Sequence, residues 1–280
     1  MNMFWPLFAF LAGGADIAYN YVSRTSLKNG GDASAYAWWF SFIRTVFFLL
    51  IILITQVSMK FDLRQLGILL TLGLINFFNL YLFMKMHALT ELSLSQIVLR
   101  LRMVWVPILA FFLIHERLSF VENLGILLVF LATVIITTPQ KIVKDESLLT
   151  TFIFSITTSL VTMIVREASL FTQTPVVVFA MSVPTVILMP LVIKSPKARI
   201  FLKWNKEVPQ KVFISALSVI LLYALILALK SGPAGKVNAV FQGVSVFSVF
   251  FGVTVLKEKE NLVKKIAGSI LILVGIFLLI

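Results

Sequence analysis

Cysteine is absent from the 280-residue sequence, and histidine occurs only twice, as His87 and His115. The chain can therefore form neither a disulfide nor a thiolate metal site. The two histidines lack the HExxH or paired spacing of a histidine metal site. A P-loop, a Rossmann glycine pattern and a serine nucleophile elbow are also missing. We accordingly predict no metal site, no cofactor and no enzymatic activity.

Charged side chains are scarce, at 13% of the residues against about 25% in an average soluble domain. Hydrophobic residues make up 60% of the chain and gather in segments near the length of about 20 residues that a membrane-spanning helix needs. The connections are too short to hold a soluble catalytic domain. We predict an all-α integral membrane protein with ten transmembrane helices, at residues 3–22, 35–56, 65–84, 93–113, 120–138, 148–165, 174–193, 210–229, 235–255 and 263–280.

The net charge of +12 would suggest a nucleic-acid partner in a soluble protein. In a membrane protein, basic residues instead gather in loops that face the anionic cytoplasmic leaflet. We therefore expect the lipid bilayer as partner, no nucleic acid, and a multi-pass position in the cell (inner) membrane. Lysine and arginine are more than twice as frequent after the odd-numbered segments as after the even-numbered ones. The positive-inside rule then places both termini outside.

An internal repeat with an offset of 142 residues organises the chain. At that offset Arg24 matches Arg166, Glu116 matches Glu258 and Tyr81 matches Tyr223. Each half holds five segments, an odd number, so two such halves in one chain must have opposite orientations. That is the inverted-repeat plan of secondary transporters, with the substrate near the midplane. We predict two five-helix repeats, at residues 1–140 and 141–280.

Polar residues inside the fourth and ninth segments are the first candidates for a substrate path. The fourth carries Gln96, Arg100 and Arg102, although a charge in lipid costs about 2.5–3.5 kcal/mol on the insertion scale. In the ninth, Asn238 matches Gln96 and Gln242 matches Arg100 at the repeat offset. A pair of packing helices does not need matched polar stripes, so we favour a role in lining the path.

The first segment presents Asp16 and Asn20 on one helical face, and the sixth offers Thr158 at the matching depth. Asp16 is the only acid well inside a segment. It is equally consistent with a structural partner for a buried arginine and with a proton site or a contact to a substrate amine. For Arg44, in the second segment, a structural pairing with Asp16 is favoured.

Further intramembrane groups are weaker candidates. Asn76 and Asn79 share a face of the third segment, and asparagines often only join helices. Trp105 and Tyr223 could stack on a substrate ring, although aromatic residues in a bundle usually pack. We retain Asn76, Trp105 and Tyr223 as supporting candidates. The remaining polar groups at segment ends we expect to be solvated or to extend towards water, namely Glu116, Glu258 and Lys236.

The chain resembles the drug/metabolite transporter superfamily, specifically its EamA-type ten-helix members. The resemblance rests on the run His115-Glu116-Arg117-Leu118-Ser119 with Gly125, on Lys257-Glu258-Lys259 with Gly268 and Gly275, and on Arg24, Arg166 and Arg44. Ala132 replaces a usual glycine, and the second half lacks a proline that would match Pro107. The resemblance implies an inverted-repeat carrier that works by alternating access, with members that move amino acids, drugs, sugar phosphates or nucleotide sugars. It also implies cytoplasmic termini, against the charge bias.

We therefore expect a secondary carrier for a small polar solute with a carboxylate or phosphate, such as an amino acid. The substrate-binding residues would be Asp16, Asn20, Gln96, Arg100, Arg102, Thr158, Asn238 and Gln242. Coupling to protons or to an exchanged solute stays open, as does the oligomeric state. A passive channel or lipid scramblase is the main alternative. A membrane-embedded enzyme would need a metal cluster or a nucleophile with its base, and an accessory subunit would need no polar lining.

Overall fold

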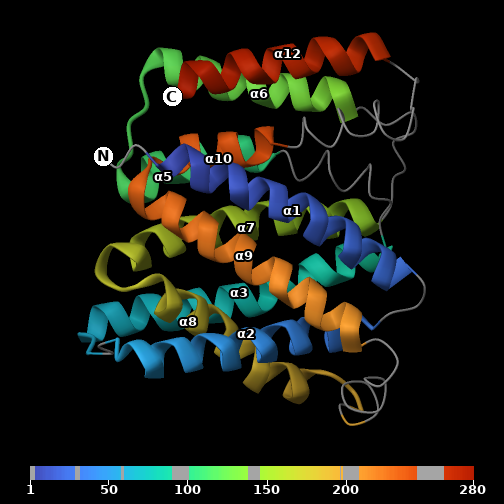
Figure 1. Cartoon of the computed structure of the whole chain (residues 1–280), viewed down its shortest axis with the longest axis vertical. Helices are drawn as coiled ribbons and strands as arrows, with labels where there is room; N and C mark the ends of the chain where they lie inside the picture. The colour runs from blue at the N-terminus through green and yellow to red at the C-terminus, as the bar shows by residue number, and fades with distance from the viewer. Residues whose placement is uncertain are drawn as a thin grey trace.

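The structure is a computed structural model that describes residues 4–28, 32–57, 60–89, 101–137, 146–195, 197, 208–244 and 262–280. Within these residues the chain forms ten helices and no strand (Figure 1). The helices are α1 (Trp5–Lys28), α2 (Ala33–Thr55), α3 (Leu63–Leu89), α5 (Arg102–Ile114), α6 (Phe120–Thr137), α7 (Glu146–Phe171), α8 (Thr174–Val192), α9 (Val208–Ser231), α10 (Ala234–Gly243) and α12 (Leu262–Leu279).

Every predicted apolar segment overlaps one of these helices, which confirms the all-helical prediction. Five helices, α2, α3, α7, α8 and α9, are long and apolar enough to cross a membrane. α5, α6 and α12 contribute shorter apolar helical stretches. The polar face of α1, with Asp16 and Asn20, makes that helix less apolar. α5 and α10 cover only parts of the fourth and ninth segments, and the remainder of each lies outside the described residues.

Three helices continue well beyond the predicted apolar segments. α1 ends at Lys28, α3 at Leu89 and α7 at Phe171, several residues past the ends of their apolar runs. Hydropathy falls where polar residues begin, but polar residues such as arginine and glutamate are good helix formers, so the backbone hydrogen bonds continue. As a consequence Arg166 lies within a helix and not in a loop.

The helices of the two sequence halves pack against one another throughout (Figure 1). α1 lies along α9, and α7, which the repeat makes equivalent to α1, lies along α3. A Cβ atom on Gly232 would lie 2.6 Å from the Trp5 ring, and Arg166 donates a hydrogen bond to the Gly232 carbonyl. The start of α1 is therefore close to the last turns of α7, the helix that the repeat makes equivalent to it. This arrangement fits a two-repeat architecture.

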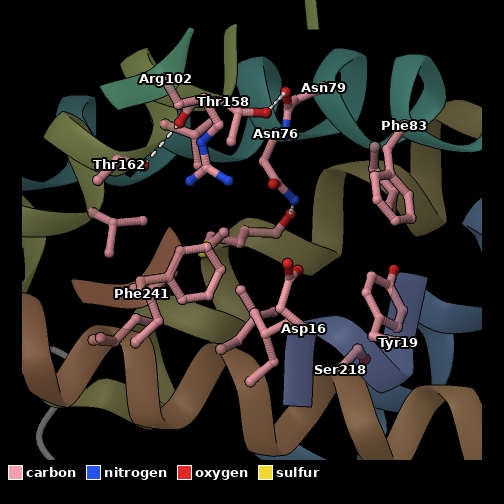
Figure 2. Close-up of a pocket in the computed structure, with 18 of the residues that line it drawn as sticks. Asp16, Tyr19, Asn76, Asn79, Phe83, Arg102, Thr158, Thr162, Ser218 and Phe241 are labelled. Carbon is pink, nitrogen blue, oxygen red and sulfur yellow. Dashed lines mark hydrogen bonds between the residues drawn. The ribbon is translucent and has the colours of Figure 1, made fainter. Parts of the chain in front are cut away.

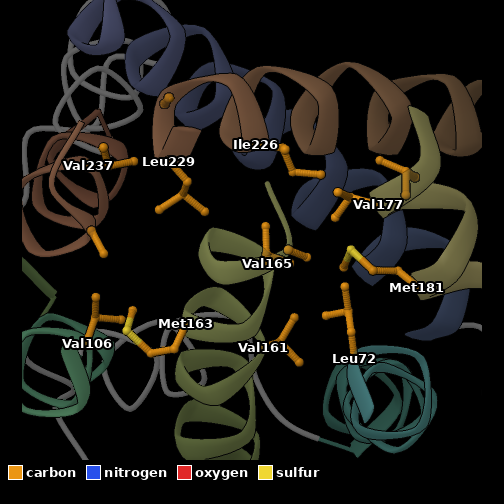
Figure 3. Close-up of a cluster of buried hydrophobic side chains, with 14 of the residues drawn as sticks. Leu72, Val106, Val161, Met163, Val165, Val177, Met181, Ile226, Leu229 and Val237 are labelled. Atoms are coloured by element: carbon orange, nitrogen blue, oxygen red, sulfur yellow. The ribbon is translucent and has the colours of Figure 1, made fainter. Parts of the chain in front are cut away.

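The main apolar core surrounds α7. Figure 3 shows Val161, Met163 and Val165 of α7 between side chains of α3, α5, α8, α9 and α10, and all three are buried. Their alternation along the helix means that α7 meets neighbours on several sides. α7 therefore joins the two halves at the centre of the molecule.

α6 and α12 form a separate pair at one edge of the bundle (Figure 1). A Cβ atom on Gly125 would lie 2.8 Å from the carbonyl oxygen of Gly275, and a Cβ atom on Gly275 would meet the Gly125 carbonyl at the same distance. Small residues allow helix backbones in a membrane to approach this closely. Gly125 and Gly275 of the family-like motif thus serve helix packing.

Candidate functional site

A cavity of about 130 Å³ lies between the helices in the middle of the bundle, and eight helices contribute to its wall. Its polar lining comes from both halves of the chain, while leucine, valine and phenylalanine side chains form most of the remainder. The polar and charged lining residues are Asp16, Tyr19, Asn20, Arg44, Asn76, Asn79, Arg102, Thr158, Thr162, Ser218 and Gln242.

Arg102 is the cation that the cavity leaves most available. Its side chain is 9% exposed, its Nε atom has no hydrogen-bond partner among the described residues, and the guanidinium lies 5.6 Å from the centre of the Phe241 ring. Figure 2 shows the Arg102 guanidinium and the Asp16 carboxylate pointing into the cavity from opposite sides. A buried guanidinium whose Nε has no hydrogen-bond partner among the described residues retains a donor for a carboxylate or phosphate.

α1 brings Asp16, Tyr19 and Asn20 to the cavity because the spacing of three and four residues keeps them on one face. The Asn20 amide donates to the Asp16 carbonyl, 2.8 Å away, which fixes the side chain against its own helix. The Tyr19 ring stacks on Phe83 with 5.2 Å between ring centres. The predicted polar face of α1 is thus continuous with an aromatic wall.

α3 and α7 meet across the cavity through polar contacts. Asn79 accepts hydrogen bonds from the hydroxyls of Thr157 and Thr158, at 2.8 and 2.7 Å. Asn76 donates to the Met181 carbonyl of α8, 2.8 Å away. The two asparagine side chains form hydrogen bonds with residues of the second half, so they hold the cavity wall in place as well as lining it.

Arg44 lines the same cavity but is held differently from Arg102. Its Nε atom donates to the Phe40 carbonyl at 3.3 Å, and Nη2 donates to the Ser41 hydroxyl at 3.4 Å. Both partners belong to its own helix, α2, and the pairing of Arg44 with Asp16 stays a prediction. With these donors occupied, Arg44 offers less to a ligand than Arg102 does.

Some predicted residues lie elsewhere. Asn238 is buried but does not line the cavity. Its side-chain amide donates to the backbone carbonyl of Arg102 at 3.2 Å and so helps to hold the start of α5 in place. Trp105 packs edge-on against Phe152, and Tyr223 is 40% exposed and stacks on Phe48. Neither aromatic ring belongs to the cavity lining. Gln96 and Arg100 lie outside the described residues.

Tyr19, Phe83 and Phe241 belong to the aromatic part of the cavity, but none of them was predicted from the sequence. Tyr19 could have been found, because it lies three residues after Asp16 on the same helical face. Phe83 and Phe241 carry no such signal in a chain with 26 phenylalanines. Aromatic residues are common packing groups, and only the assembled bundle shows which of them face the cavity.

The arrangement suits binding of an amphipathic solute and offers little to a metal ion. An anionic group could lie against Arg102, a cationic group against Asp16, and an apolar body against the leucine and phenylalanine wall. No group of three or more acids, histidines or cysteines that could hold a metal ion occurs among the described residues. The roles of these side chains in binding remain predictions.

Comparisons with known proteins agree with this architecture. A family model described as "EamA-like transporter family" matches the chain twice, over residues 3–138 and over residues 147–280. One solved structure, described as "Crystal structure of protein", superposes with a TM-score of 0.71 and 16% sequence identity, covering 98% of this chain and 97% of that chain. At this identity the likeness concerns the fold alone. No curated protein matches the sequence.

Proposed function

Because the chain belongs to the EamA-like transporter family, we propose that it is a secondary transporter that carries a small polar metabolite across the membrane by alternating access. Membership agrees with the resemblance carried by the Glu116 and Glu258 motifs and makes the chain a multi-pass membrane transporter of the drug/metabolite type. The proposal includes two inverted repeats, at residues 1–140 and 141–280, and a position in the cell (inner) membrane.

The observation that carries the proposal is the guanidinium of Arg102 in a mainly apolar cavity between the halves. A buried arginine needs its donors satisfied, and Nε of Arg102 has no hydrogen-bond partner among the described residues. A solute carboxylate would supply that partner and would be held in a bidentate manner. The apolar wall formed by residues such as Leu222, Leu225 and Phe241 favours a substrate that also has an apolar body.

The size and charge of the cavity narrow the substrate class. A volume of about 130 Å³ is roughly ten times the space that one water molecule requires, which fits a solute of amino-acid size better than a nucleotide sugar. Asp16 lies opposite Arg102 and would complement an ammonium group (Figure 2). We therefore favour an amino acid with an apolar side chain over a phosphate-bearing solute.

Counterflow in proteoliposomes tests the proposal. Vesicles loaded with an unlabelled apolar amino acid should accumulate the labelled form transiently, whereas a passive channel or a scramblase would only equilibrate it. The decarboxylated amine of the same side chain should not exchange, because it lacks the group for Arg102. In Arg102→Gln, kcat/KM should fall about a hundredfold, as expected for truncation of one partner of a buried charge pair. Arg117→Gln, at an exposed loop position, serves as the control.

Equal transport by Arg102→Gln and by the parent protein would place the substrate elsewhere. Exchange of the amine at the rate of the amino acid would remove the argument for a carboxylate. Saturable counterflow of an unrelated solute would retain the carrier and correct only the substrate class.

A further inference from the structure

A second charged site, away from the central cavity, joins the two halves at the end of the bundle where both termini lie. Its first member is Glu116, which follows α5 in the loop before α6. The Glu116 carboxylate accepts hydrogen bonds from the backbone N–H groups of Ala234 and Gly235, at 2.9 and 3.1 Å. Its side chain is only 11% exposed, contrary to the expectation of a solvated group.

These contacts supply a cap that α10 does not have in its own sequence. Pro233 occupies the N-cap position and provides no side-chain hydrogen bond to the first turn. The first N–H groups of a helix carry a partial positive charge and favour a carboxylate. A Cβ atom on Gly235 would lie 2.9 Å from Leu118, so glycine there permits the close approach. A first-half residue thus completes a second-half helix.

Arg166 extends the same site to α7 and α9. Its Nε atom lies 3.7 Å from the Glu116 carboxylate, and Nη1 donates to the carbonyls of Leu229 and Gly232 at the end of α9. The negative end of that helix favours a cation. We call Glu116, Arg166 and the first turn of α10 the interhalf clasp.

The position of the clasp relates it to the central cavity. Val165 and Leu229 both line that cavity. Val165 directly precedes Arg166 in the chain, and the Leu229 carbonyl accepts a hydrogen bond from Arg166. On the other side, Glu116 and Arg166 border an open cavity of about 900 Å³, and Arg166 also borders one of about 650 Å³. The clasp therefore lies between the central cavity and the two openings at the termini end.

We propose that the interhalf clasp is the gate on the terminus-bearing side of the transporter, and that Glu116 and Arg166 must separate for the solute to pass on that side. The inference rests on the proposed carrier function. Separation exposes a carboxylate, a guanidinium and several backbone groups, which is costly in a dry interior. Here the large openings beside them supply water, so the separated groups are hydrated and the contact is reversible.

The chain offers a matched control for this gate. Arg64 of α3 and Glu167 of α7 form another ion pair between the halves at the same end, with 3.4 Å between Nη2 and Oε1. Their side chains are 81% and 35% exposed, and exposed pairs contribute little. Glu167→Gln therefore makes the same chemical change as Glu116→Gln, in an ion pair of the same kind, without touching the clasp.

The absence of cysteine from the chain allows accessibility of the cavity to be measured directly. Ser218 lines the central cavity and is 2% exposed, so Ser218→Cys places a single thiol there with little change in volume. The protein is reconstituted with its termini facing outward and treated with a membrane-impermeant thiol reagent from outside. The modification rate then reports how often the terminus side opens.

Glu116→Gln in this background should raise the modification rate about tenfold, because it weakens two charge-assisted hydrogen bonds and an ion pair that hold the closed state. Glu167→Gln should leave the rate unchanged. An unchanged rate in Glu116→Gln overturns the gate, as does an equal increase in both variants. If Glu116→Gln does not give monodisperse protein, Arg166→Lys is measured, with the same increase expected and an unchanged rate again overturning the proposal.

This readout separates the gate from the proposed function. Labelling needs no substrate and no flux, so an increase in Glu116→Gln with no amino-acid counterflow in the parent protein would retain the gate and reject the substrate. A merely structural contact would lower thermal stability in Glu116→Gln while leaving the labelling rate of the folded protein as it was.

Discussion

The two charged sites of the molecule differ in how their charges are satisfied. In the interhalf clasp, the Glu116 carboxylate has two backbone donors and a guanidinium close by. In the central cavity, Nε of Arg102 has no hydrogen-bond partner among the described residues. Satisfied charges stabilise the protein as it stands, whereas a buried charge without a partner costs stability until a ligand supplies one. This contrast suits the interhalf clasp to holding the two halves together and the central cavity to binding a ligand.

The largest expected effect comes from replacing the unsatisfied charge. Arg102→Met should abolish counterflow yet leave the melting temperature in detergent unchanged or higher, because it removes a buried cation whose Nε has no hydrogen-bond partner among the described residues and whose burial costs stability. Its contact with Asn238 survives, since that bond uses the backbone carbonyl of Arg102. Arg44→Met is the comparison, and it should lower the melting temperature because it loses two side-chain hydrogen bonds. An equal decrease in both variants would mean that Arg102 is as well satisfied as Arg44.

The clasp should show the opposite pattern when its acid is removed. Glu116→Ala should lower the unfolding free energy by about 3 kcal/mol, the scale for breaking a buried pair by removal of one partner. Glu167→Ala should change it by no more than about 0.5 kcal/mol, because its ion pair is exposed. Thermal unfolding of both variants in the same detergent provides the measurement. Similar values for the two would mean that the clasp is no stronger than a surface pair.

The sequence was a good guide wherever a contact repeats with the period of a helix. The ten apolar segments follow from the length of the hydrophobic runs and the polar face of α1 from spacing, and the structure places Asp16 and Asn20 together on that face. The offset of 142 residues also related Arg24 to Arg166 and Glu116 to Glu258. Of these four residues the structure describes the side chains of Arg166 and Glu116 only.

Contacts between distant segments could not be predicted in this way. Glu116 lies 118 positions from Ala234 in the chain, and its place at a segment end suggested a solvated group. Lys236 was expected to extend towards water, but Nζ lies 2.6 Å from the Glu122 carboxylate of α6. Asn238 lies in the predicted polar stripe, yet its amide is used on a backbone carbonyl. Polarity shows that a buried group needs a partner, and only the packed bundle determines which partner it finds.

The smallest expected effect sharpens the comparison within the cavity itself, where Asn79 is satisfied although Arg102 is not. Asn79→Leu removes the acceptor shared by Thr157 and Thr158. Hydrogen bonds between helices in a membrane contribute only about 0.6 kcal/mol on average, so the loss of stability should be modest. A double-mutant cycle with Thr158→Val isolates the interaction, because residues in contact give non-additive changes. Coupling of that size, together with counterflow that survives in both single variants, would identify Asn79 as a wall residue that joins α3 to α7. Loss of counterflow in Asn79→Leu without loss of stability would instead move Asn79 into the binding group beside Arg102, since a substrate would then compete with the threonines for its side chain.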